Sequence, residues 1–178
     1  NAAGEFVKAI ECYRKALYIS PEITIAQYNL GKLLVSQKKF DDAINCFFRV
    51  EKLQSDFPGL YKELGKLHLH KGQVKQASES FYKQIQLTPD DADAYYFLGK
   101  ILQKQNKNDK AVEQYRKTLE LNPEYIDASL YLAVALQELG KQEDALDCYG
   151  AVIEGKPDHA EAHFGMGIAH KELGNFED

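Results

Sequence analysis

Apolar and small residues recur along the chain with the period of an α-helix, in segments separated by short polar breaks. The spacing i, i+3, i+4 and i+7 places such residues on one helix face. One face is formed by Tyr95, Leu98, Gly99 and Leu102. A second face, after the polar break Asn106 to Asn108, is formed by Ala111, Tyr115 and Thr118. The pattern therefore predicts two consecutive amphipathic helices joined by a tight turn.

The same pattern returns every 34 residues. Prolines follow this step at Pro89, Pro123 and Pro157, and the earlier equivalents are Ser55 and Pro21. Small residues follow it at Ala9, Ala43, Ala77, Ala111 and Ala145. Aromatic residues follow it at Tyr13, Phe47, Phe81, Tyr115 and Tyr149. Two further series are Leu30, Leu64, Leu98, Leu132, Met166 and Gly31, Gly65, Gly99, Ala133, Gly167. Five series in one register indicate a stack of helical hairpins.

The glycine series predicts a close contact between the two helices of each hairpin. Glycine inside a helix costs about 1 kcal/mol relative to alanine, so its recurrence needs a packing reason. We expect the alanine of the second helix to lie opposite the glycine, and the aromatic residue of that helix to wedge into the next hairpin. The recurring proline follows the second helix and ends it.

These residues resemble the tetratricopeptide repeat family. The stretch Tyr95-Tyr96-Phe97-Leu98-Gly99, followed by Ala111, Tyr115 and Pro123, reads as its signature. The resemblance implies an all-α fold, a right-handed superhelix (α-solenoid) of antiparallel helix-turn-helix units. The large aromatic residue that the family places early in the first helix is present as Tyr61 and Tyr95. It is replaced by Gln27, Ser129 and His163, and we expect looser packing at those three joints.

The register divides residues 1–178 into a single array. Residues 1–23 form a partial unit that is mainly a second helix, and residues 160–178 form a partial unit that is mainly a first helix. Full units span 24–57, 58–91, 92–125 and 126–159. We therefore expect a fragment of a longer repeat protein, cut within a unit at both ends.

Composition and charge narrow the class of partner. The chain is 44% hydrophobic with a net charge of −5, which is typical of a globular protein. Residues 1–89 carry 13 Lys and Arg against 9 Asp and Glu, whereas residues 90–178 carry 9 against 18. This bipolar charge argues against nucleic acid as a ligand. No apolar run approaches the length of a membrane span and no signal peptide opens the chain, which favours a cytoplasmic location.

Catalytic and metal chemistry find little support in the sequence. Cys12, Cys46 and Cys148 share one repeat slot, and that spacing is too wide for disulfides, so we expect free thiols. No phosphate-binding loop or catalytic triad is present, and we expect neither an enzyme nor a cofactor. His159, His163 and His170 could share a helix face, but no carboxylate or cysteine completes a metal site. His68, His163 and His170 fall in core slots, whereas His70 points elsewhere.

The resemblance implies that the first helices line a concave groove that binds a polypeptide. The predicted groove residues are Tyr28, Asn29, Lys32, Lys62, Lys66, Tyr96, Phe97, Lys100, Tyr131 and Phe164. Lys32, Lys66 and Lys100 repeat every 34 residues and predict a ladder of ammonium groups beside aromatic rings. Such a surface suits a peptide with carboxylates and apolar side chains, although solubilising lysines would produce the same pattern.

Two subtypes of the family fit less well. Members that grip a C-terminal carboxylate use a Lys/Asn set; Lys62 matches it, but Lys66 and Phe97 stand where Asn is needed. Sugar-transferring enzymes carry an Asn ladder in their repeat arms. Here only Asn29 matches, and Glu63, Phe97, Tyr131 and Gly165 follow it. We therefore predict a scaffold or adaptor that binds protein, with a substrate-recruiting arm of a larger enzyme such as a glycosyltransferase as the first alternative.

End-to-end self-assembly is the second alternative. The chain opens with a second helix that lacks its partner and closes with a first helix that lacks its own. Gly4-Glu5-Phe6 and Gly174-Asn175-Phe176 read as the same turn. The oppositely charged halves would favour a head-to-tail contact between copies.

Overall fold

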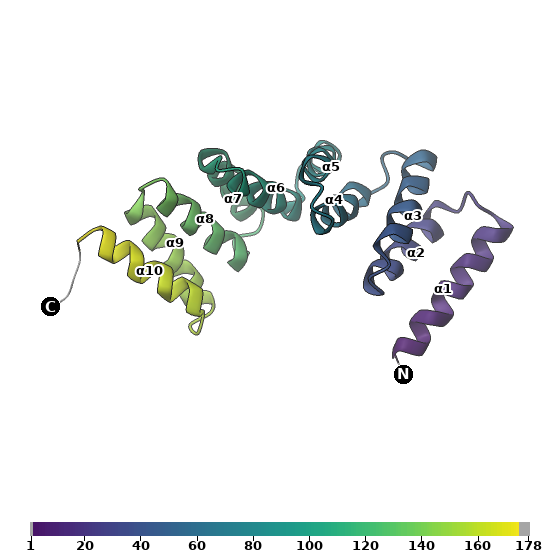
Figure 1. The fold of residues 1–178 in the computed structure, drawn as a ribbon, viewed down its shortest axis with the longest axis horizontal. Coiled ribbons are helices and arrows are strands. Elements are labelled where there is room, and N and C mark those ends of the chain that lie inside the picture. Colours follow the sequence, from purple (N-terminus) through teal and green to yellow (C-terminus); the bar gives the residue numbers. More distant parts are fainter. Residues whose placement is uncertain (1, 175–178) are drawn as a thin grey trace. The chain divides into compact units, whose positions relative to one another are not determined.

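The computed structural model describes the backbone of residues 2–174 and the side chains of residues 5–174. Within these residues the chain forms ten α-helices and no β-strand. It divides into two compact units, Asn1–Thr88 and Pro89–Asp178 (Figure 1). The all-helical prediction is confirmed, and each unit is described in turn.

The first unit holds five helices, in which each helix packs against the next one along the chain. They are α1 (Ala2–Ile19), α2 (Thr24–Ser36), α3 (Phe40–Leu53), α4 (Leu60–His70) and α5 (Val74–Leu87). The closest pairs are α2 with α3 and α4 with α5, so hairpins of two helices are the local building blocks.

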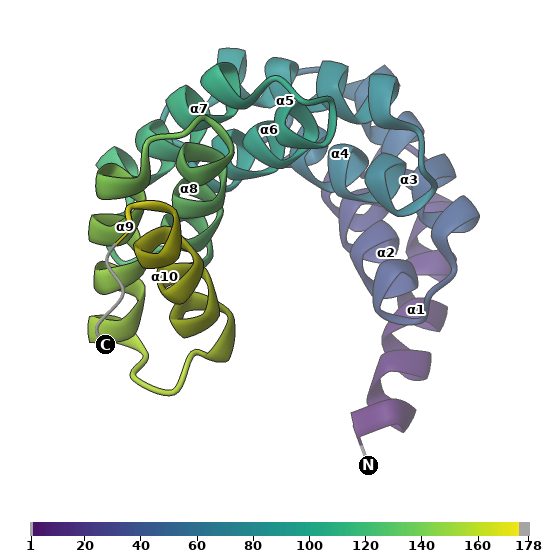
Figure 2. The same ribbon diagram turned by 60° about the vertical axis from the view of Figure 1, so that its left-hand side comes forward.

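The second unit has the same organisation. It holds α6 (Ala92–Lys104), α7 (Asn108–Leu121), α8 (Ile126–Glu138), α9 (Gln142–Gly155) and α10 (Ala160–Glu172). Besides the sequential contacts, α8 touches both α6 and α10, so the first helices of successive hairpins form one layer in this unit. Figure 2 shows α10 alongside α9, which it also contacts.

The turn inside each hairpin is the same structure every time. After the first helix, one residue adopts a positive φ, and the backbone closes with a pair of hydrogen bonds typical of a Schellman motif. After α2, for example, the Lys39 N–H donates to Leu34 O at 2.9 Å and the Lys38 N–H donates to Val35 O at 2.9 Å. The residues with positive φ are Lys38, Gly72, Asn106, Gly140 and Gly174.

The turn expected at Gly4 is absent. Gly4 occupies the same slot of the 34-residue register, yet α1 runs from Ala2 without a break. With no preceding helix in the chain to return from, the backbone has no reason to leave the helical conformation there. Of the matching segment, Gly174 is a turn residue as predicted, while Asn175 and Phe176 lie outside the described residues.

The prolines end the second helices as predicted. α5, α7 and α9 finish at Leu87, Leu121 and Gly155, and a proline follows each of them two residues later. The residue before each proline is held in the extended region by the pyrrolidine ring, which prevents another helical turn. Thr88 shows this with φ −139° and ψ 82°.

The close contact at the recurring glycines is made by the aromatic ring of the second helix, not by its alanine. A Cβ added to Gly99 would lie 2.6 Å from Tyr115 Cε1, and one added to Gly31 would lie 2.6 Å from Phe47 Cε1. Phe47, Phe81 and Tyr115 are completely buried. The expectation of alanine opposite glycine was therefore wrong, because the ring needs more room than a methyl group.

The aromatic residue also reaches the next hairpin, as expected. The rings of Tyr115 and Tyr131 are stacked with centroids 6.1 Å apart. In the following repeat, a Cβ on Gly165 would lie 2.4 Å from Tyr149 Cζ. One ring per repeat thus fills the space between a first helix and its successor.

Candidate functional site

The predicted groove residues all lie on first helices of hairpins, in two groups. The first unit presents Tyr28, Asn29 and Lys32 on α2 and Lys62 and Lys66 on α4. The second unit presents Tyr96, Phe97 and Lys100 on α6, Tyr131 on α8 and Phe164 on α10. We call these two groups the first and the second aromatic–lysine face.

Tyr96 lies at the centre of the second aromatic–lysine face. It is buried, with 5% of its surface exposed, and is surrounded by other rings. The distances between ring centroids are 5.2 Å to Phe97, 4.9 Å to Tyr125, 5.9 Å to Tyr131 and 6.3 Å to Tyr115. Aromatic pairs at such separations and tilts are favourable beyond simple burial. The cluster therefore forms a rigid base that joins α6, α7 and α8.

Lys100 rests on this base. Its ammonium nitrogen lies 5.3 Å from the centroid of Tyr96 and 4.6 Å from that of Tyr131. Burial acts to lower the pKa of Lys100, but the hydroxyl groups of Tyr96 and Tyr131 outweigh it, and the pKa lies above its ordinary value. The ammonium group is consequently charged at neutral pH and held in place by the faces of two rings.

Tyr125 completes the cluster, although the sequence reading did not single it out. Its hydroxyl donates a hydrogen bond to Asp93 Oδ1 at 2.9 Å, which ties the loop before α8 to the first turn of α6. Burial and the Asp93 carboxylate raise the pKa of Tyr125. An aromatic residue two positions after the repeat proline was the available signal.

The first aromatic–lysine face repeats this geometry 68 residues earlier. Tyr28 packs on Phe57 with centroids 4.8 Å apart and on Phe47 at 5.6 Å. The Lys32 ammonium lies 5.8 Å from the centroid of Tyr28. Lysine four residues after tyrosine is the motif that both units share, because these positions are adjacent on a helix surface.

The two faces differ in what surrounds that motif. Asn29 and Glu63 occupy the slots that hold Phe97 and Tyr131 in the second unit. Burial raises the pKa of Tyr28; Glu63 raises it further and Lys62 lowers it, so both charges act at this ring. The first face is therefore more polar, and the second is more aromatic.

Solvent reaches part of each face. Lys32 is exposed and Phe164 on α10 has 72% of its surface exposed. Phe97, Lys100 and Tyr131 are half-buried, so that ring edges and an ammonium group remain available above the buried Tyr96. This combination can accept carboxylates through the lysine and apolar side chains through the rings.

The histidines lie apart from these faces. His68 is buried, as expected for a core slot, and its Nδ1 lies 2.8 Å from Gln73 Oε1. His163 and His170 were expected in the core but are exposed, because no described helix covers that side of α10. His159 instead ends the loop before α10, and its Nδ1 accepts from the Ala162 N–H at 3.4 Å.

Cysteines and metal ligands add no second candidate. All three cysteines are free thiols: Cys46 is buried, Cys148 is half-buried and Cys12 is exposed. Over the described part of the chain, no three His, Cys, Asp or Glu side chains are grouped to hold a metal ion. In that same part, no helix combines the length and apolar character needed to cross a bilayer.

Comparison with known families identifies the repeat. Family models described as "Tetratricopeptide repeat" match residues 3–23, 28–92, 92–125 and 114–147, and one described as "TPR repeat" matches 135–174. The chain belongs to the tetratricopeptide repeat family, as the sequence resemblance predicted. Repeats of this family serve as scaffolds for protein interaction, and that is the class of protein the fold defines. No curated protein sequence matches the chain.

Solved structures of similar fold come from the same family. YrrB, described as "a TPR protein with an unusual peptide-binding site", is 26% identical with a TM-score of 0.85; the match covers 94% of this chain and 87% of YrrB. MamA is 27% identical with a TM-score of 0.81, covering 90% of this chain and 94% of MamA. MamA from Desulfovibrio magneticus RS-1 shares the fold at 21% identity and a TM-score of 0.78, with coverage of 89% and 90%.

Proposed function

We propose that the chain binds an extended segment of a partner protein on its aromatic–lysine faces, and that it acts by binding rather than by catalysis. The observation that carries the proposal is the placement of Lys100, whose ammonium group is fixed over Tyr96 and Tyr131 beside the half-buried Phe97. A fixed charge beside apolar surface loses little conformational freedom on binding, which favours affinity.

The chemistry of the faces indicates the chemistry of the ligand. An ammonium group without a carboxylate directly above it recruits an acidic side chain, while ring edges recruit an apolar one. The exposed Phe164 on α10 extends the apolar part of the second face. The expected ligand is therefore a peptide in which carboxylates alternate with apolar or aromatic residues.

The similarity to YrrB supports this proposal, since that protein has a peptide-binding site and a closely similar fold. The proposal does not depend on where YrrB holds its peptide. It depends on the faces described above.

The location of binding can be tested directly by NMR. A peptide selected from a displayed random library would be titrated into ¹⁵N-labelled chain, and amide shifts mapped. We expect the largest shifts on α6 and α8 around Lys100, and weaker binding by Lys100→Glu. Lys110→Glu, an equal charge change at an exposed position of α7, is the matched control. Shifts confined to other surfaces would contradict the proposal.

A second candidate function is head-to-tail association of copies. α1 carries apolar side chains with large exposed fractions: Phe6 46%, Val7 50%, Tyr18 89% and Ile19 79%. On α10, a Cβ added to Gly167 would meet nothing within 4 Å, so the side that other first helices bury is open there. Two open apolar surfaces of complementary repeat type could bury one another in neighbouring copies.

A further inference from the structure

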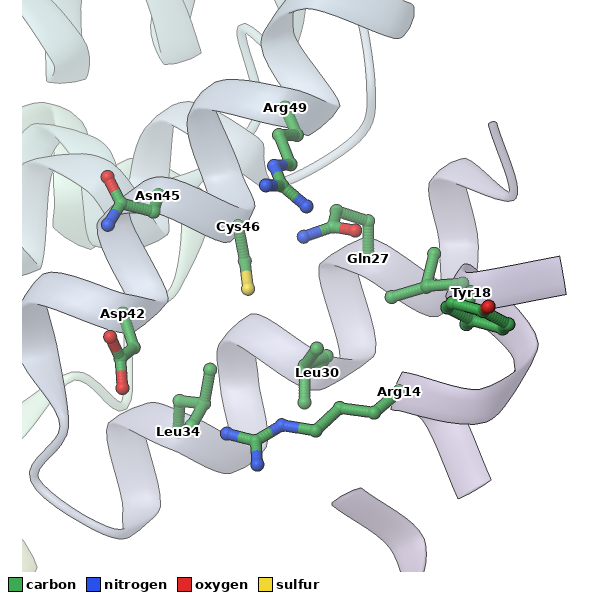
Figure 3. A pocket seen from close by; sticks show the side chains of 10 residues that line it. Arg14, Tyr18, Gln27, Leu30, Leu34, Asp42, Asn45, Cys46 and Arg49 are labelled. Carbon is green, nitrogen blue, oxygen red and sulfur yellow. The ribbon is translucent and has the colours of Figure 1, made fainter. Parts of the chain in front are cut away.

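A cavity of about 470 Å³ lies among α1, α2 and α3, apart from the aromatic–lysine faces (Figure 3). Its floor is made by α2, through Gln27, Leu30 and Leu34. Its walls come from α1 and α3, through Arg14, Leu17, Tyr18, Asp42, Asn45, Cys46 and Arg49. All of these residues belong to the first unit.

The cavity exists because Gln27 replaces an aromatic residue. The equivalent cavity one repeat later, among α3, α4 and α5, measures about 220 Å³ and has Tyr61 at the position of Gln27. Where Ser129 takes that position, a cavity of about 480 Å³ opens beside Pro123 and Ile126. Looser packing was predicted at Gln27 and Ser129, and both joints confirm it.

The filled joint shows what such a cavity accommodates. The hydroxyl of Tyr61 donates to Glu51 Oε1 at 3.0 Å, and the Lys83 ammonium lies 4.8 Å from the centre of its ring. One repeat earlier, Arg49 stands at the position of Lys83 and Leu17 stands at that of Glu51. An aromatic ring entering the cavity at Gln27 would therefore find a cation to lie against, as Tyr61 does.

The polar end of such a ring would meet different partners. Leu17 offers no acceptor for a phenol, whereas Arg14, at the position of Phe48, adds a guanidinium donor. The wall that accepts a hydrogen bond from Tyr61 is thus replaced by one that donates. The matching ligand carries an acceptor, and a carboxylate is the acceptor that arginine binds best.

The charges around the cavity agree with an anionic ligand. The lining holds two guanidinium groups and one carboxylate, Asp42. Neither Arg14 nor Arg49 forms an ion pair or hydrogen bond with another described residue. Asp42 lies seven residues before Arg49, about 10 Å away along α3, and Figure 3 shows them at opposite ends of the cavity. A carboxylate at the Arg49 end would escape repulsion by Asp42.

The floor at that end is neutral and polar. Gln27 is 2% exposed, and its amide is a hydrogen-bond partner of the Cys46 thiol. Figure 3 shows Cys46 and Gln27 directed toward one another, with the Arg49 guanidinium beside the Gln27 amide.

We propose that this cavity binds an aromatic side chain that stands next to a carboxylate in a partner polypeptide. The ring occupies the space that Tyr61 fills one repeat later and lies against Arg49. The carboxylate is held by the guanidinium groups. The site uses the side of α2 that faces α1 and α3, so a partner can engage it independently of Tyr28 and Lys32 on the aromatic–lysine face.

The probe for this site is the peptide acetyl-Asp-Phe-Asp-amide, titrated to millimolar concentration into ¹⁵N-labelled chain. We expect shifts of the backbone amides around Gln27, Cys46 and Arg49. The uncharged acetyl-Asn-Phe-Asn-amide and the ring-free acetyl-Asp-Ala-Asp-amide should each bind about tenfold more weakly or not at all. No shift at these amides, or equal binding of all three peptides, would overturn the proposal.

Two variants then locate the site. Gln27→Tyr should fill the cavity, raise the melting temperature and abolish binding, and Arg49→Gln should weaken binding about fivefold or more without affecting the fold. Ser129→Tyr fills the unrelated cavity of the second unit, and Lys100→Glu alters only the aromatic–lysine face; both should bind as wild type does. Unchanged binding by a folded Gln27→Tyr or by Arg49→Gln contradicts the assignment. Failure of the aromatic–lysine faces would leave these results as they are.

Discussion

Lys38 and Asn106 stand in turn positions that glycine fills at three other repeats. Both have positive φ, 59° and 58°, in a region that L-residues enter at a cost of about 1–2 kcal/mol. Asn pays less of this cost than Lys because its short side chain tolerates the left-handed conformation. The strain is tolerated because the Schellman hydrogen bonds close the turn around it.

Replacing Lys38 with glycine should therefore stabilise the chain. We expect a gain of about 1 kcal/mol, and Asn106→Gly should gain less. Thermal unfolding measures the change, and 1 kcal/mol corresponds to roughly 2–4 °C in a chain of this size. Gln37→Gly, one residue earlier and with φ −87°, is the control and should destabilise. A loss of stability in Lys38→Gly would show that the turn is not strained.

Gly99 tests the contact between ring and helix. Alanine is the better helix former by about 1 kcal/mol, but its Cβ would lie 2.6 Å from Tyr115, and Tyr131 stacks on the far side of that ring. Gly99→Ala should thus cost about 1–3 kcal/mol, and Gly99→Leu more.

The matched control is Gly167→Ala in the same repeat slot, where an added Cβ meets nothing within 4 Å. It should be neutral or stabilising. Denaturant unfolding of both variants measures the difference. If the two substitutions changed stability equally, the ring contact would not be the reason for the glycine.

At the scale of helices, the sequence predicted each hairpin but not the bonds between neighbouring hairpins. In the second unit, Tyr115 donates to Gln103 Oε1 at 3.0 Å and Tyr149 donates to Gln137 Oε1 at 2.9 Å. The same glutamines donate onward, Gln103 to Glu138 at 3.3 Å and Gln137 to Glu172 at 3.4 Å.

A signal for these bonds was present but needed the structure to be understood. Where the ring is phenylalanine, at Phe47 and Phe81, the residue twelve positions earlier is Val35 or Leu69. Tyrosine pairs with glutamine and phenylalanine with an aliphatic residue, because a buried hydroxyl needs an acceptor. Periodicity identifies the ring's slot, whereas the choice of partner depends on side-chain directions that spacing does not specify. The same holds for Tyr125, whose loop position concealed its contact with Tyr96.

The buried tyrosines make the second unit sensitive to alkali. Burial raises the pKa of Tyr115 and, together with Asp93, that of Tyr125; burial also raises that of Tyr96. Because the fold favours the protonated phenols, their contribution to stability is complete below pH 10, the pKa of the unfolded side chain, and is lost as the pH rises above it.

We therefore expect the melting temperature to fall steeply above pH 10. Tyr115→Phe should lower stability at pH 8, since it loses the bond to Gln103, but should flatten the fall above pH 10. Melting curves at steps between pH 8 and pH 11.5 measure both effects. An identical alkaline slope in the variant would exclude Tyr115 as a contributor.

At the scale of the whole molecule, charge divides along the chain. Residues 1–89 have a net charge of +4 and residues 90–178 one of −9, counting Lys and Arg against Asp and Glu. Copies that meet head to tail would bring unlike charges together, and salt would weaken that attraction.

If α1 and α10 of neighbouring copies associate, the mass measured by light scattering should rise with concentration and fall again at high salt. Phe6→Ser and Phe164→Ser, on the two exposed surfaces, should each reduce the association, while Tyr82→Ser, at an exposed position of α5, should not. A strictly monomeric mass at millimolar protein and low salt would exclude this mode.

The most direct test of the binding role is a comparison of two triple variants. Lys32→Glu, Lys66→Glu and Lys100→Glu together reverse the lysines of the aromatic–lysine faces. Lys52→Glu, Lys75→Glu and Lys110→Glu change the net charge equally at exposed positions of α3, α5 and α7.

The affinity of a library-selected acidic peptide for both variants would be measured by calorimetry, with circular dichroism confirming helicity. We predict a loss of about 1–3 kcal/mol, roughly 5- to 150-fold, for the first variant and a much smaller loss for the second. Equal affinities of the two variants would contradict binding on the aromatic–lysine faces.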